Sequence, residues 1–158
     1  SMQRSLYITA LAAFLFDQFT KILVVFYLDL KNILFVEVIP PFLNFSMAWN
    51  YGINFGIFAN DSGLQKWVLT AFAVLVSLAL IYWVKHEPTT KIGLISAGLL
   101  IGGALGNAFD RVIYGAVADF LNMSCCGIGN PFAFNFADVE IFIGAFVLAI
   151  FGTTKNKR

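Results

Sequence analysis

The stretch IGLISAGLLIGGALGNAFDRVIY, from Ile92 to Tyr114, decides the fold class of this chain. A helix needs about 20 predominantly apolar residues to cross the roughly 30 Å hydrocarbon core of a bilayer, and this stretch is long enough. It nevertheless carries Asn107, Asp110 and Arg111 near its end. Because a charge at the centre of a membrane helix costs about 2.5 to 3.5 kcal/mol on insertion scales, these residues need partners or a function.

The composition of the whole chain also indicates a membrane protein. Of its 158 residues, 59% are hydrophobic and 12% are charged, and the mean hydropathy is +0.82. A soluble domain is about 45 to 50% apolar and about 25% charged, so soluble enzyme classes are excluded. The net charge of +1, without a long basic run, gives no sign of a nucleic-acid partner. We expect one integral membrane domain over residues 1–158.

Four apolar stretches are long enough to span a membrane as helices. They cover about residues 5–28, 64–84, 92–114 and 136–153. The first stretch has an alternative interpretation as a signal peptide, because Arg4 precedes it, but Asp17 and Lys21 interrupt it and no clear cleavage pattern follows. The predicted fold is therefore a mainly α-helical bundle of four transmembrane helices.

The positions of the cations predict the orientation of this bundle, because cytoplasmic loops are rich in Lys and Arg. Six cations flank one side of the predicted spans and three flank the other. The first group is Arg4, Lys85, Lys91, Lys155, Lys157 and Arg158, and the second is Lys31, Lys66 and Arg111. Both termini are therefore predicted to be cytoplasmic, and the long connections at about 29–63 and 115–135 extracytoplasmic.

The external connections predict a small β-sheet. Apolar and smaller or polar residues alternate in residues 42–50 and again in residues 132–137, and this period is typical of strands with one apolar face. The apolar positions are Leu43, Phe45, Met47 and Trp49 in the first segment and Phe132, Phe134 and Phe136 in the second. We expect a sheet on the outer membrane surface with these aromatics toward lipid. An irregular aromatic loop anchored at the interface is the alternative.

Several polar residues within the predicted spans have spacings that pair them. Asp17 and Lys21 are four residues apart on one helix face, as are Asn107 and Arg111, and Asp110 lies one turn from Asn107. For all four charged residues, a polar clamp that fixes the bundle is favoured over direct catalysis. Close helix packing is the role expected of the glycines Gly102, Gly103 and Gly106.

Asp119 and Asp138 differ, because each lies where a predicted span meets the outer surface. Asp119 follows the third span and Asp138 opens the fourth, so the two can converge at one depth. A helix N-terminus favours the ionised form of Asp138, whereas Asp119, beside Phe120, is less well solvated. This asymmetry suits an acid and base pair. The alternative is that Asp138 is only an N-cap and Asp119 only an interfacial anchor.

Other catalytic chemistries lack suitable residues in the sequence. The single histidine, His86, falls in the predicted cytoplasmic connection and cannot serve an external nucleophile or metal site. The adjacent Cys125 and Cys126 have Cα atoms about 3.8 Å apart, below the roughly 4.4 to 6.8 Å usual for a disulfide, and are expected to be loop thiols. We expect neither a metal nor a cofactor.

Five motif blocks resemble those of the lipoprotein signal peptidases, or signal peptidase II, a family of bacterial intramembrane aspartic peptidases. They are DQFTK at Asp17–Lys21, NYGINF at Asn50–Phe55, GNAFDR at Gly106–Arg111, VADF at Val117–Phe120 and FNFAD at Phe134–Asp138. The blocks follow the family's order, and the resemblance covers nearly the whole chain. The second block departs from the family, which usually has two small apolar residues where this chain has Ile53 and Asn54.

The resemblance implies that Asp119 and Asp138 are the catalytic dyad of an endopeptidase of prolipoproteins. Cleavage would fall just before a Cys that bears diacylglycerol, at the outer face of the bacterial cytoplasmic (inner) membrane. Implied partners are this prolipoprotein, membrane lipid and, as inhibitor, the cyclic peptide globomycin, and no cofactor is implied. The residues implied to line or support the site are Asn50, Gly52, Asn107, Asp110, Arg111, Asn135 and Ala137, with Asp17 and Lys21 below it.

A small ion-coupled transporter or channel is the competing hypothesis, in which Asp17, Lys21, Asp110 and Asp119 relay ions across the bundle. A relay needs ionisable residues across the full depth of the bilayer, whereas most of those in this chain lie in the outer half. The second and fourth predicted spans offer no ionisable side chain in mid-membrane. The distribution favours the peptidase, and a catalytically silent assembly factor is a third hypothesis.

Overall fold

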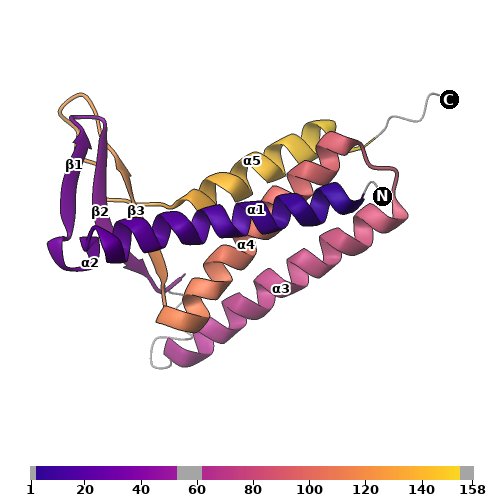
Figure 1. Ribbon diagram of the computed structural model, residues 1–158, viewed down its shortest axis with the longest axis horizontal. Coiled ribbons are helices and arrows are strands. Elements are labelled where there is room, and N and C mark those ends of the chain that lie inside the picture. The colour runs from indigo at the N-terminus through magenta and orange to yellow at the C-terminus, as the bar shows by residue number, and fades with distance from the viewer. Residues whose placement is uncertain (1–2, 53–61, 154–158) are drawn as a thin grey trace.

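The computed structural model describes residues 3–52 and 62–153. Long helices form a bundle, and a three-stranded sheet lies at one end of it (Figure 1). The elements are α1 (Gln3–Lys21), its π-helical continuation η1 (Ile22–Tyr27), α2 (Leu30–Ile33), β1 (Phe35–Ile39), β2 (Leu43–Asn50), α3 (Ser62–His86), α4 (Lys91–Tyr114), β3 (Val117–Met123) and α5 (Phe136–Phe151). The predicted combination of a mainly helical protein with a small sheet is confirmed.

Among the residues that the structure describes, three helical segments are long and apolar enough to cross a membrane, as judged by length and composition. They are Gln3–Tyr27, Gly63–His86 and Lys91–Tyr114. Large apolar side chains on the bundle surface, such as Phe72 at 65% and Phe142 at 71% exposure, suit contact with lipid. The helix α5 has 16 residues, fewer than the about 20 of a typical crossing. In Figure 1, α1 begins and α5 ends at the end of the bundle away from the sheet.

Glycines let α4 approach its neighbours closely. A Cβ atom added at Gly102 would lie 2.6 Å from the backbone oxygen of Ala10 in α1, and one at Gly103 would lie 2.6 Å from the backbone oxygen of Ala137 in α5. A Cβ at Gly106 would overlap the carboxylate of Asp17. Larger residues would force the helices apart, so the predicted packing role of these glycines is confirmed.

The helix α5 begins part of the way along α4. The backbone N–H of Thr90 donates to the oxygen of Gly152 at 3.1 Å, which places the end of α5 level with the start of α4. At a rise of about 1.5 Å per residue, α5 reaches the level of Asn107 and leaves roughly 10 Å of α4 beyond it. The side chain of Asn135, the N-cap of α5, donates to Asn107 Oδ1 at 3.0 Å, in agreement with this level. The N-terminus of α5 therefore lies inside the bundle.

The sheet is antiparallel and has the order β1-β2-β3. The strand predicted from the alternation in residues 42–50 is confirmed as β2. The strand β3 is buried at every position except Met123, so its sequence shows no alternating pattern. The prediction of a strand at residues 132–137 is wrong. Phe134 makes one isolated bridge to Leu121, and Phe136 is already the first residue of α5.

The apolar face of β2 packs against the protein interior. Phe45 meets Phe120 edge-on with ring centroids 5.7 Å apart, and Trp49 lies 5.9 Å from Tyr114. Both side chains pack on a buried cluster made of Val24, Val25, Leu30, Ala118, Phe120 and Leu121. The expectation that these aromatics face lipid is therefore wrong for Phe45, Trp49, Phe134 and Phe136, which pack on the buried cluster. Phe132 is 77% exposed, so for this residue the expectation stays a prediction.

Candidate active site

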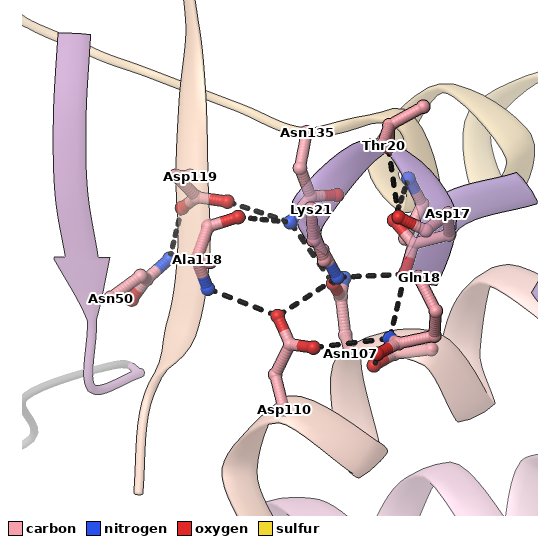
Figure 2. Close-up of polar contacts among 12 residues, drawn as sticks. Asp17, Gln18, Thr20, Lys21, Asn50, Asn107, Asp110, Ala118, Asp119 and Asn135 are labelled. Atoms are coloured by element: carbon pink, nitrogen blue, oxygen red, sulfur yellow. Dashed lines mark hydrogen bonds and ion pairs between the residues drawn. The ribbon is translucent and has the colours of Figure 1, made fainter. Parts of the chain in front are cut away.

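Asp17, Lys21 and Asp110 form a buried ion cluster between α1 and α4 (Figure 2). All three side chains have no exposed surface. The Nζ atom of Lys21 lies 2.7 Å from Asp17 Oδ2 and 2.9 Å from Asp110 Oδ2. It also donates to Asn107 Oδ1 at 3.1 Å, so each of its three N–H donors has an acceptor. The predicted pairing of Asp17 with Lys21, and the clamp through Asp110, are confirmed.

Gln18 completes this cluster from α1. Its Nε2 atom lies 3.1 Å from both the backbone oxygen of Gly106 and Asp110 Oδ1, and 3.2 Å from Asp17 Oδ2. The motif comparison assigns no role to this residue. A polar side chain beside Asp17 in an apolar span is the sequence signal that points to it.

Each carboxylate of the cluster also holds the backbone just before one of the candidate catalytic residues. Asp110 Oδ2 accepts the N–H of Ala118 at 3.0 Å, and the next residue of β3 is Asp119. Asp17 Oδ1 accepts the N–H of Ala137 at 3.0 Å, and the next residue of α5 is Asp138. One ion cluster therefore positions a strand and a helix relative to each other.

Asn135 links Asp119 to Asp138. Its Nδ2 atom donates to Asp119 Oδ1 at 2.8 Å, and its Oδ1 atom accepts the N–H of Asp138 at 2.9 Å. The backbone N–H of Asn135 donates in return to Asp138 Oδ2 at 3.1 Å. This reciprocal pair is a capping box that satisfies free N–H groups at the start of α5. The two predicted acids thus lie on either side of one asparagine.

Two further asparagines hold the outer oxygens of the pair. Asn107 Nδ2 donates to Asp138 Oδ1 at 3.1 Å, and Asn50 Nδ2 donates to Asp119 Oδ2 at 3.2 Å. The side-chain oxygen of Asn50 accepts the N–H of Gly52 at 2.8 Å. The structure therefore gathers Asn50, Gly52, Asn107 and Asn135 around the two acids. Ile53 and Asn54, where the second motif block departs from the family, lie outside the described residues.

Asp119 is the better shielded of the two acids, with 4% of its surface exposed. Burial, followed by the nearby Asp138 carboxylate, raises the pKa of Asp119 to about 7. The hydrogen bonds from Asn50 and Asn135 act in the opposite direction without cancelling this shift. Asp138 lies in the first turn of α5, where the positive end of the helix dipole favours a negative charge. The predicted asymmetry between the two environments is present.

A cavity of about 260 Å³ lies between α3, α4 and α5. Its lining is Leu69, Phe72, Ala73, Val76, Leu100, Ala104, Asn107, Arg111 and Ile141. Asn107 connects this largely apolar cavity to the pair of acids, because its side chain lines the cavity and also donates to Asp138. The Nε atom of Arg111 is buried and has no hydrogen-bond partner within residues 3–52 and 62–153. The charge of Arg111 interacts with that of Asp110, a member of the ion cluster, and with those of Asp119 and Asp138. Its place in the clamp stays a prediction.

Glu140 is a buried acid that the motif blocks do not point to. It lies in the second turn of α5 and is 9% exposed, and its Oε1 atom has no hydrogen-bond partner in the part of the chain that the structure describes. The fourth predicted span thus does contain an ionisable side chain, toward the end that carries the two acids. Its sequence signal is simply an acid within an apolar stretch.

The fold and the site define a membrane protein with two carboxylates held close together in unlike environments, an arrangement that suits acid and base catalysis. A family model described as signal peptidase (SPase) II matches residues 9–154. The chain belongs to the signal peptidase II family. Membership makes it a peptidase of the membrane.

Named relatives cover nearly all of the chain. A lipoprotein signal peptidase of Alteromonas mediterranea is 41% identical over 93% of this chain and 79% of its own length. One of Burkholderia mallei is 38% identical over 94% and 87% of the two chains. Two solved structures of bacterial membrane enzymes, 30% and 29% identical, match with TM-scores of 0.75 and 0.69. Each match covers 90% of this chain, and 88% and 84% of the respective structures.

We predict that Lys21→Met lowers the free energy of unfolding by about 3 to 5 kcal/mol, because it leaves Asp17 and Asp110 buried without their cation. Thermal unfolding of the purified protein in detergent measures this. Lys85→Met, at an exposed lysine near the end of α3, is the control and should leave the midpoint nearly unchanged. Equal midpoints for the two variants would contradict a stabilising role for the ion cluster.

Proposed function

We propose that this chain is a single-domain aspartic endopeptidase that removes signal peptides from diacylglyceryl-modified prolipoproteins, just before the lipidated Cys. The observation that carries the proposal is the bridge through Asn135, which bonds Asp119 on one side and Asp138 on the other. Membership of the signal peptidase II family and relatives named lipoprotein signal peptidase support the substrate class. No step of the mechanism below requires a metal or cofactor.

The environments of the two acids support a division of roles. Burial raises the pKa of Asp119 to about 7, so Asp119 keeps a proton near neutral pH and acts as the acid. Asp138 accepts hydrogen bonds from Asn107 and from the backbone of Asn135 at the start of a helix, so it carries the negative charge and acts as the base.

The reaction then follows from these roles. Asp138 removes a proton from a water molecule, whose oxygen bonds to the scissile carbonyl carbon. Asp119 donates its proton to the carbonyl oxygen as the tetrahedral intermediate forms. When the C–N bond breaks, the amine of the lipidated Cys takes the proton held by Asp138, and the hydroxyl proton returns to Asp119. Both acids end in their starting states.

The level of the site supports a substrate held in the membrane. With α5 as the fourth span, its N-terminus lies roughly 10 Å short of the end of α4, which is below the outer surface. A diacylglycerol in the outer leaflet anchors the substrate Cys near this depth, so binding of the acyl chains brings the scissile bond to the acids. The excess of cations at the other end of the bundle supports cytoplasmic termini and an extracytoplasmic site in a bacterial cytoplasmic membrane.

The cavity between α3, α4 and α5 supports binding of an apolar segment of the substrate. Its lining is apolar except for Asn107 and Arg111, and the free Nε–H of Arg111, which has no partner among the described residues, is available to a backbone carbonyl of the bound peptide. Asn50, exposed at the end of β2, supports the outer side of the same peptide. A cyclic peptide such as globomycin inhibits by competing for this space.

The first test is processing of a diacylglyceryl-modified prolipoprotein by the purified protein. We predict that Asp119→Asn and Asp138→Asn each slow cleavage by about 10²- to 10⁴-fold, the usual contribution of a general acid or base. Glu87→Gln is a control at an exposed acid just after α3, at the end of the bundle away from the sheet, and it should cleave at the wild-type rate. Thermal melts establish that every variant is folded. Wild-type turnover by a folded Asp119→Asn or Asp138→Asn variant would refute the dyad.

We predict that kcat/KM falls as the pH rises through about 7, because Asp119 then loses the proton that it must donate. Below this pH the proton is present, so the decline belongs to the alkaline side. Asn50→Ala removes a hydrogen bond that lowers the pKa of Asp119, and the alkaline decline should therefore move to higher pH. Rates measured between about pH 5 and pH 9 test this. A profile that stays level above pH 7 would contradict the assigned role.

Asn135→Ala separates the bridging role of this residue from its capping role. Thr90→Ala is the matched variant, because Thr90 is the side-chain N-cap of α4 and lies at the opposite end of the bundle. Each change should cost about 0.5 to 2 kcal/mol of stability. Only Asn135→Ala should reduce cleavage, and by more than tenfold, since only Asn135 contacts both acids. Equal activity of the two variants would limit Asn135 to a structural cap.

A further inference from the structure

The segment that follows β3 contains a tight turn at residues 125–128. The N–H of Ile128 donates to the oxygen of Cys125 at 2.9 Å, and the two residues form an antiparallel bridge. The central residues, Cys126 and Gly127, have φ angles of 63° and 78°. Positive φ at both central positions is the signature of a type I′ turn.

Cys126 is an unusual residue for this position. Glycine, asparagine and aspartate supply most left-handed residues, and a side chain such as that of cysteine costs roughly 1 to 2 kcal/mol in this conformation. The turn places the Sγ atom of Cys126 2.7 Å from that of Cys125, and both residues are exposed. A backbone outlier that brings two reactive groups together indicates a function.

We propose that Cys125 and Cys126 are a redox-active vicinal dithiol, which closes reversibly into a disulfide by exchange with an external disulfide, of low molecular weight or on a protein. One cysteine thiolate attacks the oxidant's S–S bond, forms a mixed disulfide and releases the first thiol. The second cysteine attacks the mixed disulfide and releases the other thiol. Two hydrogens and two electrons pass from the protein to the oxidant. Reduction by a thiol reverses both steps.

The spacing of the two residues makes this disulfide labile. Adjacent Cα atoms are held about 3.8 Å apart, short of the usual separation for a disulfide, so the closed ring is strained and easily reduced. Strained, exposed disulfides are the ones that exchange, whereas structural ones resist reduction. The short spacing therefore disfavours a permanent structural disulfide and favours one that forms reversibly.

The rest of the segment is anchored, so that ring closure involves only the turn. Asn130 Nδ2 donates to the oxygen of Met123 at 3.1 Å, and the N–H of Asn130 donates to Ser124 Oγ at 3.2 Å. Asn122 Nδ2 donates to the oxygen of Asn130 at 2.7 Å. The supply of oxidant rests on the extracytoplasmic orientation proposed above, because disulfides persist in oxidising compartments. The chemistry of the purified protein does not depend on that orientation.

Intact mass tests the proposal directly, since the chain has two cysteines in all. The full-length protein in detergent is equilibrated with mixtures of reduced and oxidised glutathione and then blocked with N-ethylmaleimide. In reducing mixtures we expect a form that carries two maleimide adducts. As the fraction of oxidised glutathione rises, this form should be replaced by one without adducts, whose mass is two hydrogen atoms below that of the unmodified dithiol protein. Added thiol should restore the first form.

Cys126→Asn is the matched variant, because asparagine tolerates the left-handed conformation and keeps the turn. It should take a single glutathione at Cys125 and never lose two hydrogens. A wild-type protein that ends as a glutathione adduct, as a disulfide-linked dimer or with two maleimides in every mixture would overturn the dithiol. The readout is independent of proteolysis, so this failure would leave the proposed peptidase untouched.

Discussion

The burial of Lys21 is the constraint on which the rest of the structure depends. An ammonium group without exposed surface inside a bundle of apolar helices is tolerated only if anions and hydrogen-bond acceptors surround it. Asp17 supplies one carboxylate from the same helix, and Asp110 supplies the other from α4. The backbones of α1 and α4 can approach closely enough because Gly106 has no Cβ to collide with Asp17. The salt bridges of Lys21 therefore depend on the close helix packing that Gly106 allows.

This ion cluster determines the positions of the two catalytic candidates, Asp119 and Asp138. Asp119 and Asp138 must lie close together, although two nearby carboxylates repel each other when both are ionised. Neither residue can hold the other in place. Their positions come instead from Asp110 and Asp17, which bind the backbone N–H groups of Ala118 and Ala137. The carboxylates of the ion cluster thus hold the backbone beside both acids. Asn135 then fixes their side chains.

Much of this arrangement is predictable from sequence, and the rest fails for identifiable reasons. Apolar length gave the long helices, and a four-residue spacing gave the pairing of Asp17 with Lys21. The strand β3 was not predicted, because a fully buried strand has no alternation and directly follows a helix. The alternating residues 132–137 were misleading, since Asn135 caps a helix there. Arg111 and Glu140 are recognisable in the sequence as polar residues within apolar spans, but the sequence does not predict which residues they contact.

The short helix α5 explains why so many asparagines surround the acids. A helix that begins inside the bundle exposes its first N–H groups where water is scarce, and a free N–H in an apolar setting costs several kcal/mol. Asn135 and Asp138 satisfy these groups through the capping box. Asn107 on α4 bonds the side chains of both residues at the same level. The polar side chains that satisfy the start of the helix are also those that contact Asp119 and Asp138. The same few amides thus allow α5 to start inside the bundle and, in the proposed mechanism, hold the two acids that carry out hydrolysis.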